Sequence, residues 1–240
     1  MISKISGISL IDKDDKTLLR LNRALESMDA LARVAWALEY LPQTQVVSSS
    51  FGIQSAVMLH LMARLQPQIP VVLIDTGYLF AETYQFIDRL SDQLELNLQV
   101  YRPIRSAAWQ EARHGQLWQE GKAGIDEYNR SHKVEPMRRA LQELQVATWY
   151  VGLRREQSTS RESLPVLRLQ QDRFKVHPLV DWSKRDIHRY LNQHDLPYHP
   201  LWQKGYQTVG DAHSSQPLQT GQSEEQSRFS GLVRECGLHL

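Results

Sequence analysis

Cysteine is nearly absent from this sequence, because only one of its 240 residues, Cys236, is a cysteine. A lone thiol excludes a disulfide within the chain and a zinc site of four cysteines. It also excludes an iron–sulfur cluster held by a single chain. We therefore expect no bound cofactor, no metal and no iron–sulfur cluster, and a reducing compartment suits the free thiol.

Long apolar runs and a strong net charge are also missing. The first eleven residues carry Lys4 and scattered serines but no apolar stretch as long as a secretory signal. No segment approaches the roughly 20 apolar residues that span a bilayer. Lys and Arg number 28 against 27 Asp and Glu, a net charge of +1, which gives no general reason for binding nucleic acid or membranes. We expect a cytoplasmic protein with neither of those partners.

The composition that is present suits a buried core. Hydrophobic residues make up 41% of the chain and charged residues 23%, as in soluble globular proteins. The charge is unevenly distributed. Residues 1–101 hold 8 basic and 11 acidic side chains, whereas residues 130–189 hold 13 basic and 7 acidic, so the net charge changes from −3 to +6. An anionic ligand against the second stretch explains this imbalance, and so does an ordinary solvated basic face.

The spacing of apolar residues predicts an α/β protein. Apolar residues recur at three- and four-residue intervals from Leu18 to Leu38, which is the stripe of an amphipathic helix, and Pro42 follows its end. Strand-like runs then alternate with helical patterns. The strands are expected at 45–49, 71–74, 96–101 and 148–152, and the helices at 54–65, 82–94 and 136–144. This alternation predicts a mostly parallel sheet flanked by helices, with ligands beyond the carboxyl ends of the strands.

The last third of the chain has a different pattern. Shorter strand-like pieces at 166–169 and 174–176 lead to a helix at 184–191, whose start at Ser183 has the character of a capping box. Residues 211–227 are polar and rich in Ser and Gln, which predicts a mobile connector. We therefore divide the chain into an α/β domain with an N-terminal helical segment, residues 1–210, and a flexible C-terminal segment, residues 211–240.

Polar residues follow the first two strands. Residues 48–55 read Ser-Ser-Ser-Phe-Gly-Ile-Gln-Ser. Such a strand-to-helix turn directs hydroxyl and backbone N–H groups into open space, where the helix amino end favours an anion. Ser-rich turns also cap helices without binding a ligand, and the acid and hydroxyl after the second strand have the same alternative role. The candidate binding residues are Ser48, Ser49, Ser50, Phe51, Gly52, Gln54, Asp75, Thr76 and Tyr78.

Cationic residues follow the fourth strand. Residues 152–158 read Gly-Leu-Arg-Arg-Glu-Gln-Ser, and Arg161 comes soon after. Each guanidinium can hold two phosphate oxygens in a fixed fork, which favours an anion site over a solvated surface. Lys133 lies just ahead of the helix at Pro136, although an ordinary exposed lysine is the alternative. The candidates here are Lys133, Arg154, Arg155, Gln157, Ser158 and Arg161.

The carboxyl end of the chain places the lone thiol between cations. Residues 234–239 read Arg-Glu-Cys-Gly-Leu-His. Arg234 or a protonated His239 near Cys236 would favour the thiolate, which is the nucleophilic form. The alternative is an incidental thiol near a frayed chain end.

Together these motifs resemble those of the assimilatory phosphoadenosine phosphosulfate (PAPS) reductases, in particular the thioredoxin-dependent kind of enteric bacteria. The resemblance covers residues 48–55, 75–78, 133–136, 152–158 and 235–239, and runs from about Arg33 to His239. The terminal Glu-Cys-Gly-Leu-His sequence is its most specific part. The resemblance implies an adenine-nucleotide alpha-hydrolase-like fold, a homodimer, and a sulfonucleotide-binding domain over which the C-terminal cysteine closes.

The resemblance also separates two related substrates. Adenylylsulfate reductases, whose substrate lacks the 3′-phosphate, hold a [4Fe–4S] cluster with a Cys-Cys pair and a Cys-x-x-Cys pair. The corresponding positions here are Tyr128, Asn129, Asp211 and Ser214. The absence of these cysteines agrees with the 3′-phosphorylated substrate, although it does not physically explain the preference.

The mechanism that the resemblance implies uses Cys236 and His239 as catalytic residues. Cys236 attacks the terminal sulfur of PAPS, and His239 helps to hold or polarise the sulfonate. The arginines, including Arg234, and Lys133 neutralise phosphate and sulfonate oxygens. Because the chain has no second cysteine, an external dithiol must release sulfite from the enzyme. Reduced thioredoxin is the implied donor, with glutaredoxin as an alternative.

Two other classes of function remain open at this stage. The fold could serve an ATP-dependent ligase with a pyrophosphatase loop, but residues 50–55 read Ser-Phe-Gly-Ile-Gln-Ser and lack the second glycine and the Asp of that loop. A non-catalytic sulfonucleotide-binding module would bind its ligand equally well without Cys236. Activity of a Cys236→Ser variant separates that module from an enzyme.

Overall fold

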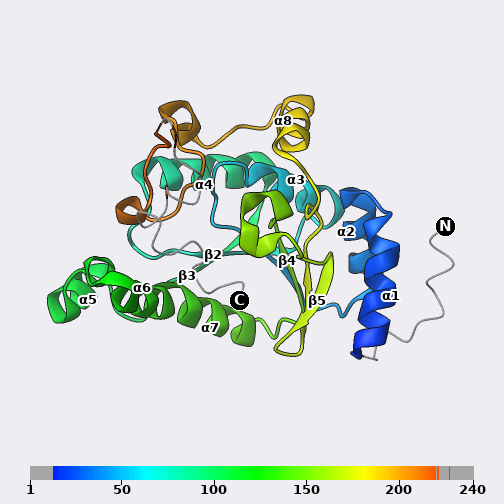
Figure 1. Ribbon diagram of the computed structural model, residues 1–240, viewed down its shortest axis with the longest axis horizontal. Coiled ribbons are helices and arrows are strands. Elements are labelled where there is room, and N and C mark those ends of the chain that lie inside the picture. Colours follow the sequence, from blue (N-terminus) through cyan, green and yellow to red (C-terminus); the bar gives the residue numbers. More distant parts are fainter. Residues whose placement is uncertain (1–12, 220, 222–226, 228–240) are drawn as a thin grey trace.

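The computed structural model describes residues 13–219, 221 and 227 of the chain, and a six-stranded sheet lies at its centre (Figure 1). The strand order is β3-β2-β1-β4-β6-β5. The strands are β1 (Gln45–Ser48), β2 (Pro70–Ile74), β3 (Asn97–Tyr101), β4 (Thr148–Val151), β5 (Leu167–Gln170) and β6 (Arg173–Val176). All neighbouring strands of this sheet are parallel except β5 and β6. The predicted mostly parallel sheet is confirmed.

Eight α-helices occur in the described part of the chain. They are α1 (Asp15–Glu26), α2 (Ala30–Tyr40), α3 (Ala56–Leu65), α4 (Ala81–Leu94), α5 (Ala107–His114), α6 (Gly121–Asn129), α7 (Glu135–Glu143) and α8 (Lys184–Gln193). A π-helical turn, Arg130–Val134, connects α6 to α7. Short 3₁₀ helices cover Leu117–Gln119, Arg155–Gln157, Thr159–Arg161, Pro200–Lys204 and Ala212–Ser214. None of these helices is both long and apolar enough to cross a membrane.

Alternate side chains of the strands face two different helical layers. On one face, Val46 and Val72 pack with Met137 and Leu141 of α7. On the other face, strand residues such as Val47 join a larger core with residues of α2, α3 and α4. Figure 1 shows α3 and α4 above the sheet and α5, α6 and α7 below it. The two-sided burial explains why the predicted strands read as continuous apolar runs.

The strand order of the sheet changes direction between β1 and β4. The chain moves outward from β1 through β2 to β3, and then returns to place β4 on the other side of β1. At such a switch point the loops leaving the two neighbouring strands diverge and open a crevice. The loops after Ser48 and Val151, which carry the serine and arginine motifs, therefore lie on either side of this crevice.

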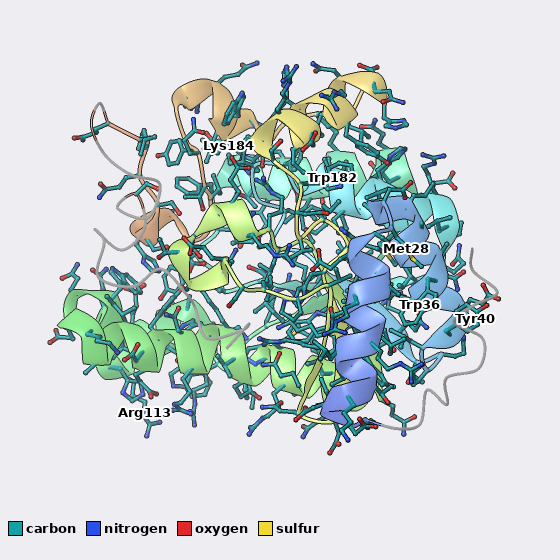
Figure 2. All side chains as sticks on the ribbon, turned by 45° about the vertical axis from the view of Figure 1, so that its right-hand side comes forward. Met28, Trp36, Tyr40, Arg113, Trp182 and Lys184 are labelled. Carbon is teal, nitrogen blue, oxygen red and sulfur yellow. The ribbon has the colours of Figure 1, made fainter. Side chains whose placement is uncertain are left out.

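The N-terminal apolar stripe forms two helices rather than the one that its spacing predicts. The chain leaves the helical path after α1, and Asp29 caps α2 by accepting a hydrogen bond from the backbone N–H of Ala32 at 2.8 Å. Met28 lies at this bend (Figure 2). A capping carboxylate satisfies helix-start N–H groups, so the apolar repeat continues across the break while the backbone does not.

The first residues of the predicted mobile connector are packed against the protein. Asp211 and Ser214 are 1% and 2% exposed. Asp211 forms an antiparallel bridge with Leu79. Polar composition predicted mobility here, but these polar side chains are buried with partners, so residues 211–215 belong to the folded core. The division of the chain at residue 210 stays a prediction.

Candidate functional site

A cavity of about 310 Å³ lies at the carboxyl ends of β1, β2 and β4. It is placed where the strand order reverses, as the strand-helix alternation predicts for a ligand site. The structure brings ten of the predicted residues together around it. These are Ser48, Ser49, Ser50, Gly52, Gln54, Thr76, Lys133, Arg154, Gln157 and Arg161.

The serine turn is held in an unusual backbone conformation. Phe51 has a φ of 48°, in the left-handed region that non-glycine residues rarely adopt. Its side chain is fully buried, and its N–H donates to the hydroxyl of Ser49 at 3.0 Å. The packed ring fixes the backbone that would otherwise relax. Phe51 therefore shapes the turn from beneath and does not line the cavity.

Two serine hydroxyls anchor the ends of this turn. Ser55 donates to the carbonyl of Gly52 at 2.9 Å, which closes the turn at the helix start. On the strand side, the indole N–H of Trp149 donates to the hydroxyl of Ser48 at 2.7 Å. Both ends of the turn are thereby fixed by neighbours, and the loop presents hydroxyls near a helix amino end that favours anions.

Arg154 forms the opposite wall of the cavity. Only 4% of this residue is exposed, and its guanidinium donates to Gln54 at 2.7 Å and to the carbonyl of Trp182 at 3.1 Å. The contact with Gln54 joins the arginine loop to the serine turn across the switch point. A buried guanidinium with a fixed orientation can bind oxygens of an anion at little further entropic cost.

Two further cations complete this wall. Arg161 donates to the side chain of Gln157 at 2.6 Å, which keeps it beside Arg154. Lys184 begins α8 and lines the same cavity, and its backbone N–H donates to Glu156 at 2.7 Å. Figure 2 shows Lys184 at the start of this helix, near Trp182. Lys184 was not predicted as a site residue, although the capping box at Ser183 indicated that a helix amino end lies there.

Lys133 enters the cavity from the π-helical turn. Such turns are found frequently at functional sites because the extra residue redirects a side chain. The Lys133 ammonium lies 2.6 Å from the Asp211 carboxylate, and 5.2 Å from the centre of the Tyr128 ring. Burial lowers the pKa of the adjacent His132, despite the opposing effect of a hydrogen bond to the Tyr128 carbonyl.

The arrangement suits an anion that also has an apolar portion. The lining contains four cationic side chains, Lys133, Arg154, Arg161 and Lys184, and one carboxylate, Asp211. Apolar side chains, including Met58, Leu179 and Ile187, line the rest of the cavity. Phosphates with an attached nucleobase have this combination of properties. Within the described residues, no three His, Cys, Asp or Glu side chains are grouped so that they could hold a metal ion.

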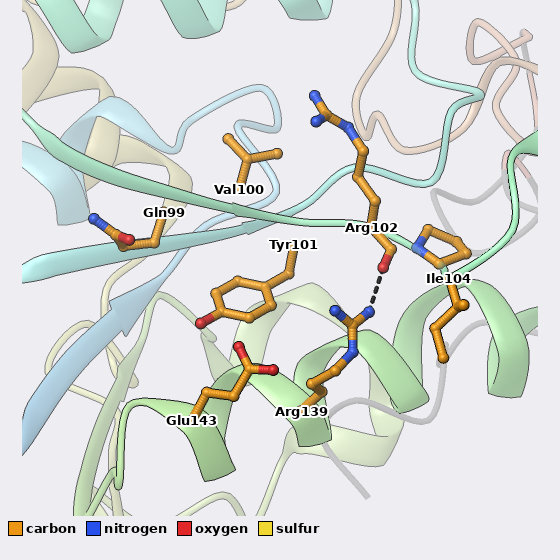
Figure 3. A pocket seen from close by; sticks show the side chains of 8 residues that line it. Gln99, Val100, Tyr101, Arg102, Ile104, Arg139 and Glu143 are labelled. Atoms are coloured by element: carbon orange, nitrogen blue, oxygen red, sulfur yellow. Dashed lines mark hydrogen bonds between the residues drawn. The ribbon is translucent and has the colours of Figure 1, made fainter.

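A second, more open hollow of about 460 Å³ on the outer edge of the sheet has a different character (Figure 3). It is lined by β3 and α7, and the guanidinium of Arg139 donates to the carbonyl of Arg102. The side chain of Arg102 pairs with Asp75 at 2.8 Å, and that of Arg139 with Glu135 at 3.3 Å. Since it holds none of the predicted motif residues, we do not treat this hollow as the site.

Comparison with known proteins identifies the family. The family model of the phosphoadenosine phosphosulfate reductase domain matches residues 44–217. A phosphoadenosine 5′-phosphosulfate reductase of Shewanella oneidensis is 59% identical over 222 residues, which cover 92% of this chain and 91% of that protein. One from Escherichia coli is 56% identical over 237 residues, covering 98% and 97%. The chain belongs to the phosphoadenosine phosphosulfate reductase family. The predicted resemblance is confirmed.

One solved structure of a PAPS reductase agrees with this family membership, and a second structure has a similar fold. The phosphoadenylyl-sulfate reductase of Candida auris, solved as a phosphate complex, is 27% identical with a TM-score of 0.74, covering 86% of this chain and 98% of that one. The FMN adenylyltransferase of Candida glabrata is 15% identical with a TM-score of 0.58, covering 93% and 76%. The second likeness shows the fold alone, and it agrees with the predicted adenine-nucleotide alpha-hydrolase-like architecture.

Some residues predicted as binding residues of this PAPS reductase family member lie beside the cavity rather than in its lining. The Asp75 carboxylate accepts hydrogen bonds from Arg102, Tyr84 and the N–H of Gly77. Burial raises the pKa of Asp75, but the hydrogen bonds from Arg102 and Tyr84 outweigh burial and leave the pKa below its usual value. Asp75 thus holds the loop after β2 in shape.

The other predicted residues outside the lining have neighbours of their own. Tyr78 donates to Glu111 at 2.7 Å and packs edge-on against Trp118. Arg155 pairs with Glu26 of α1 at 2.5 Å. The hydroxyl of Ser158 is hydrogen-bonded to that of Ser160 at 2.8 Å. Their direct contact with substrate stays a prediction, and sequence alone gave no signal that separates Arg155 from Arg154.

The predicted catalytic residues lie beyond the described part of the chain. Cys236 and His239, together with the predicted binding residue Arg234, fall within residues 228–240, which the structure does not describe. Their roles in this family member stay predictions.

Proposed function

We propose that this protein reduces PAPS to sulfite and adenosine 3′,5′-bisphosphate, with reduced thioredoxin as the electron donor, in assimilatory sulfate reduction. The observation that supports this most directly is the cavity at the switch point, which gathers four cationic side chains in a chain that belongs to the PAPS reductase family. The relatives from Shewanella oneidensis and Escherichia coli are named phosphoadenosine 5′-phosphosulfate reductases.

The cavity residues neutralise and orient the substrate in this proposal. Arg154 and Arg161 contact phosphate oxygens through charge-assisted hydrogen bonds, and Lys133 and Lys184 add point charges. The hydroxyls of the serine turn supply neutral donors to one of the anionic groups. Apolar residues such as Met58 and Ile187 accommodate the nucleoside portion. The extra cations give a physical basis for preferring the 3′-phosphorylated nucleotide.

The first chemical step is sulfonate transfer to Cys236. The thiolate attacks the terminal sulfur of PAPS, and a sulfur–sulfur bond forms while the bond from that sulfur to the phosphate oxygen breaks. The electron pair leaves with the phosphate oxygen, so adenosine 3′,5′-bisphosphate is released and Cys236 becomes S-sulfocysteine. Arg234 favours the thiolate, and His239 holds or polarises the sulfonate.

The second step needs an external dithiol because Cys236 is the only cysteine of the chain. One thiolate of reduced thioredoxin attacks the sulfur of Cys236 and expels sulfite, which leaves a mixed disulfide. The second thiol of thioredoxin then attacks that disulfide, which restores the Cys236 thiol and oxidises thioredoxin. Glutaredoxin is an alternative dithiol of the same chemistry.

The remaining proposals concern the setting of the reaction. The reaction needs a reduced Cys236, so we place the protein in the cytoplasm, where thiols stay reduced. We also propose that it acts as a homodimer, without a bound metal, iron–sulfur cluster or other cofactor, and without nucleic-acid or membrane partners. Iron and acid-labile sulfide in the purified protein would contradict the cofactor proposal.

The test is a direct assay of substrate choice. The purified protein is incubated with reduced thioredoxin and either PAPS or adenylylsulfate, and sulfite is measured. We expect rapid sulfite formation from PAPS and a value of kcat/KM for adenylylsulfate that is lower by about 100-fold or more, because one phosphate loses its charge-assisted contacts. Equal turnover of both nucleotides would overturn the substrate assignment. A protein that consumes ATP and forms pyrophosphate instead would favour a ligase.

A further inference from the structure

The Asp211 carboxylate connects two parts of the site that are far apart in the sequence. One oxygen lies 2.6 Å from the Lys133 ammonium, and the other accepts a hydrogen bond from the Thr76 hydroxyl at 2.5 Å. The side chains of Lys133 and Asp211 are only 8% and 1% exposed. All three residues line the cavity at the switch point. The pair is therefore a buried ion pair at the edge of the proposed substrate site.

The backbone around Asp211 is fixed as firmly as its side chain. Asp211 is bridged to Leu79, and the next N–H, that of Ala212, donates to the carbonyl of Tyr78 at 2.8 Å. The N–H of Tyr78 in turn donates to the Thr76 hydroxyl at 3.3 Å. The carboxylate therefore cannot move without disturbing the loop after β2. Asp211 is also the first residue of the predicted C-terminal segment, residues 211–240, which contains Cys236.

A fixed carboxylate restricts a side chain that is otherwise flexible. A lysine ammonium sits on a four-carbon stem with many rotamers, so its position in an open cavity is poorly defined unless a partner holds it. An ammonium has three N–H donors, and it can therefore bind Asp211 and an anionic ligand at the same time. The ring of Tyr128, 5.2 Å from the ammonium, limits its movement on another side.

We propose that Asp211 is a positioning residue for sulfonate transfer, which holds the Lys133 ammonium at the cavity and ties the start of residues 211–240 to the loop after β2. The inference rests on the proposed function, because it assigns Lys133 to the neutralisation of substrate oxygens. Asp211 itself touches no substrate in this account, and its effect on the reaction passes through Lys133.

A double-mutant cycle tests this dependence. Asp211→Asn keeps the size of the side chain and removes its charge, and Lys133→Met removes the ammonium. The rate of adenosine 3′,5′-bisphosphate release from PAPS is measured in a single turnover, so that slow variants remain measurable over hours. We expect Asp211→Asn to lower this rate by about tenfold or more when Lys133 is present, and by less than about twofold in the Lys133→Met protein.

The control is Asp126→Asn, because Asp126 pairs with Lys122 at 2.5 Å on the exposed surface of α6. It should change the rate by less than about twofold in both backgrounds. If Asp211→Asn lowers the rate by the same factor with and without Lys133, Asp211 acts only through the general fold and the proposal is overturned. A change below about twofold in the presence of Lys133 overturns it as well.

If Asp211→Asn does not fold, a second variant tests the same dependence on Lys133. Thr76→Val removes only the hydroxyl that donates to Asp211, and it takes the place of Asp211→Asn in the same cycle. We expect a loss of about threefold or more that again requires Lys133, whereas equal losses in both backgrounds overturn the proposal. If the wild-type protein is active and the losses of rate in the double-mutant cycle are additive, only this inference is contradicted and the proposed function stands. A wild-type protein that transfers no sulfonate contradicts the proposed function and this inference with it.

Discussion

Arg154 and Arg155 are adjacent in sequence, yet their guanidinium groups serve different parts of the molecule. Arg154 lies in the cavity wall and contacts Gln54. Arg155 turns away toward α1, where it pairs with Glu26 at 2.5 Å and donates to the carbonyl of Leu164 at 2.9 Å. The backbone changes conformation between them, because Arg154 is extended and Arg155 begins a 3₁₀ helix, so the two side chains leave the chain in different directions.

We therefore expect the two arginines to respond differently to substitution. Arg154→Met should weaken the binding of adenosine 3′,5′-bisphosphate by roughly 10- to 150-fold, because a charge-assisted hydrogen bond contributes about 1.5–3 kcal/mol. Arg155→Met should change this affinity by less than about threefold and lower thermal stability instead. Titration calorimetry and thermal melts measure both effects, with Arg20→Met on the exposed face of α1 as the control. Equal losses of affinity at 154 and 155 would contradict the assignment.

The buried Asp75 carboxylate gives a pH dependence with a definite sign. Its pKa is lowered, because hydrogen bonds from Arg102 and Tyr84 outweigh the effect of burial. A lowered pKa in the folded state means that Asp75 stabilises the protein above the ordinary carboxyl pKa of about 4. That stabilisation is lost as the pH falls through the folded pKa.

The corresponding experiment compares the wild type with Asp75→Asn by urea unfolding between about pH 3 and pH 7. We expect the variant to be less stable by about 1.5–3 kcal/mol at pH 7, since hydrogen bonds to a charged group are lost. The difference should start to shrink below about pH 4, because the unfolded carboxyl then takes up a proton that the folded carboxyl, with its lowered pKa, takes up only at lower pH. Asp172→Asn, at a side chain that is 91% exposed, should show little effect. A difference that stays constant over this range would refute the explanation.

At the scale of elements, the N-terminal helices support the loop after β6. Arg33 of α2 is completely buried, and it contacts both carboxylate oxygens of Asp181 at 2.7 and 2.8 Å. It also donates to the carbonyls of Leu25 and Pro178 at 2.9 Å. These contacts connect α1 and α2 to the loop after β6, which leads into the cavity at Leu179. The helical segment at the start of the chain thereby helps to position the site.

The unequal burial of this ion pair predicts unequal effects of removing its two partners. The Arg33 side chain is 0% exposed, whereas that of Asp181 is 42% exposed. Asp181→Ala leaves the buried guanidinium with carbonyl partners alone and should cost about 2 kcal/mol, less than a fully buried pair because Asp181 is partly exposed. Arg33→Met removes the buried charge itself and should cost less. Urea unfolding measures both, with Asp172→Ala as a surface control near zero. A larger loss for Arg33→Met would contradict this account.

The elements that sequence predicted well are those with strong periodicity and clear ends. The strands at β1, β2 and β4 are short apolar runs buried on both faces, and the capping box at Ser183 marked α8. The break between α1 and α2 was missed because the apolar repeat runs through it. The helix α6 was missed although it buries Ile125 and Tyr128. The helix α5 was also missed, since it buries no residue completely and leaves Trp109 59% exposed. A helix without a buried stripe gives little periodic signal.

The candidate site was predictable in part for the same physical reason. Residues that follow parallel strands meet at one edge of the sheet, so the serine and arginine motifs could be placed together from sequence. Lys184 and Asp211 join the cavity from segments outside that pattern, and their positions depend on packing over long distances along the chain. Composition also misled at Asp211, because a polar residue that is paired inside the protein has the same sequence signature as one in a mobile connector.

At the scale of the whole molecule, the proposed function divides the work between a binding domain and a reactive chain end. The α/β domain supplies the cavity and its four cations. In this proposal the single cysteine supplies the nucleophile, and the chain has no other cysteine to displace the sulfonate. The reaction should therefore stop after one turnover when no dithiol is present, with the sulfonate still bound to the protein.

The most direct test is the intact mass of the protein after incubation with PAPS in the absence of any thiol. We expect one added sulfonate per chain, located by peptide mapping in the segment that contains Cys236, with one equivalent of adenosine 3′,5′-bisphosphate in solution. Reduced thioredoxin should remove the adduct and release sulfite. Cys236→Ser should bind the nucleotide but form no adduct, because a serine hydroxyl is not ionised near neutral pH. Turnover by the serine variant, or repeated sulfite release by the wild type without a thiol, would contradict the covalent mechanism.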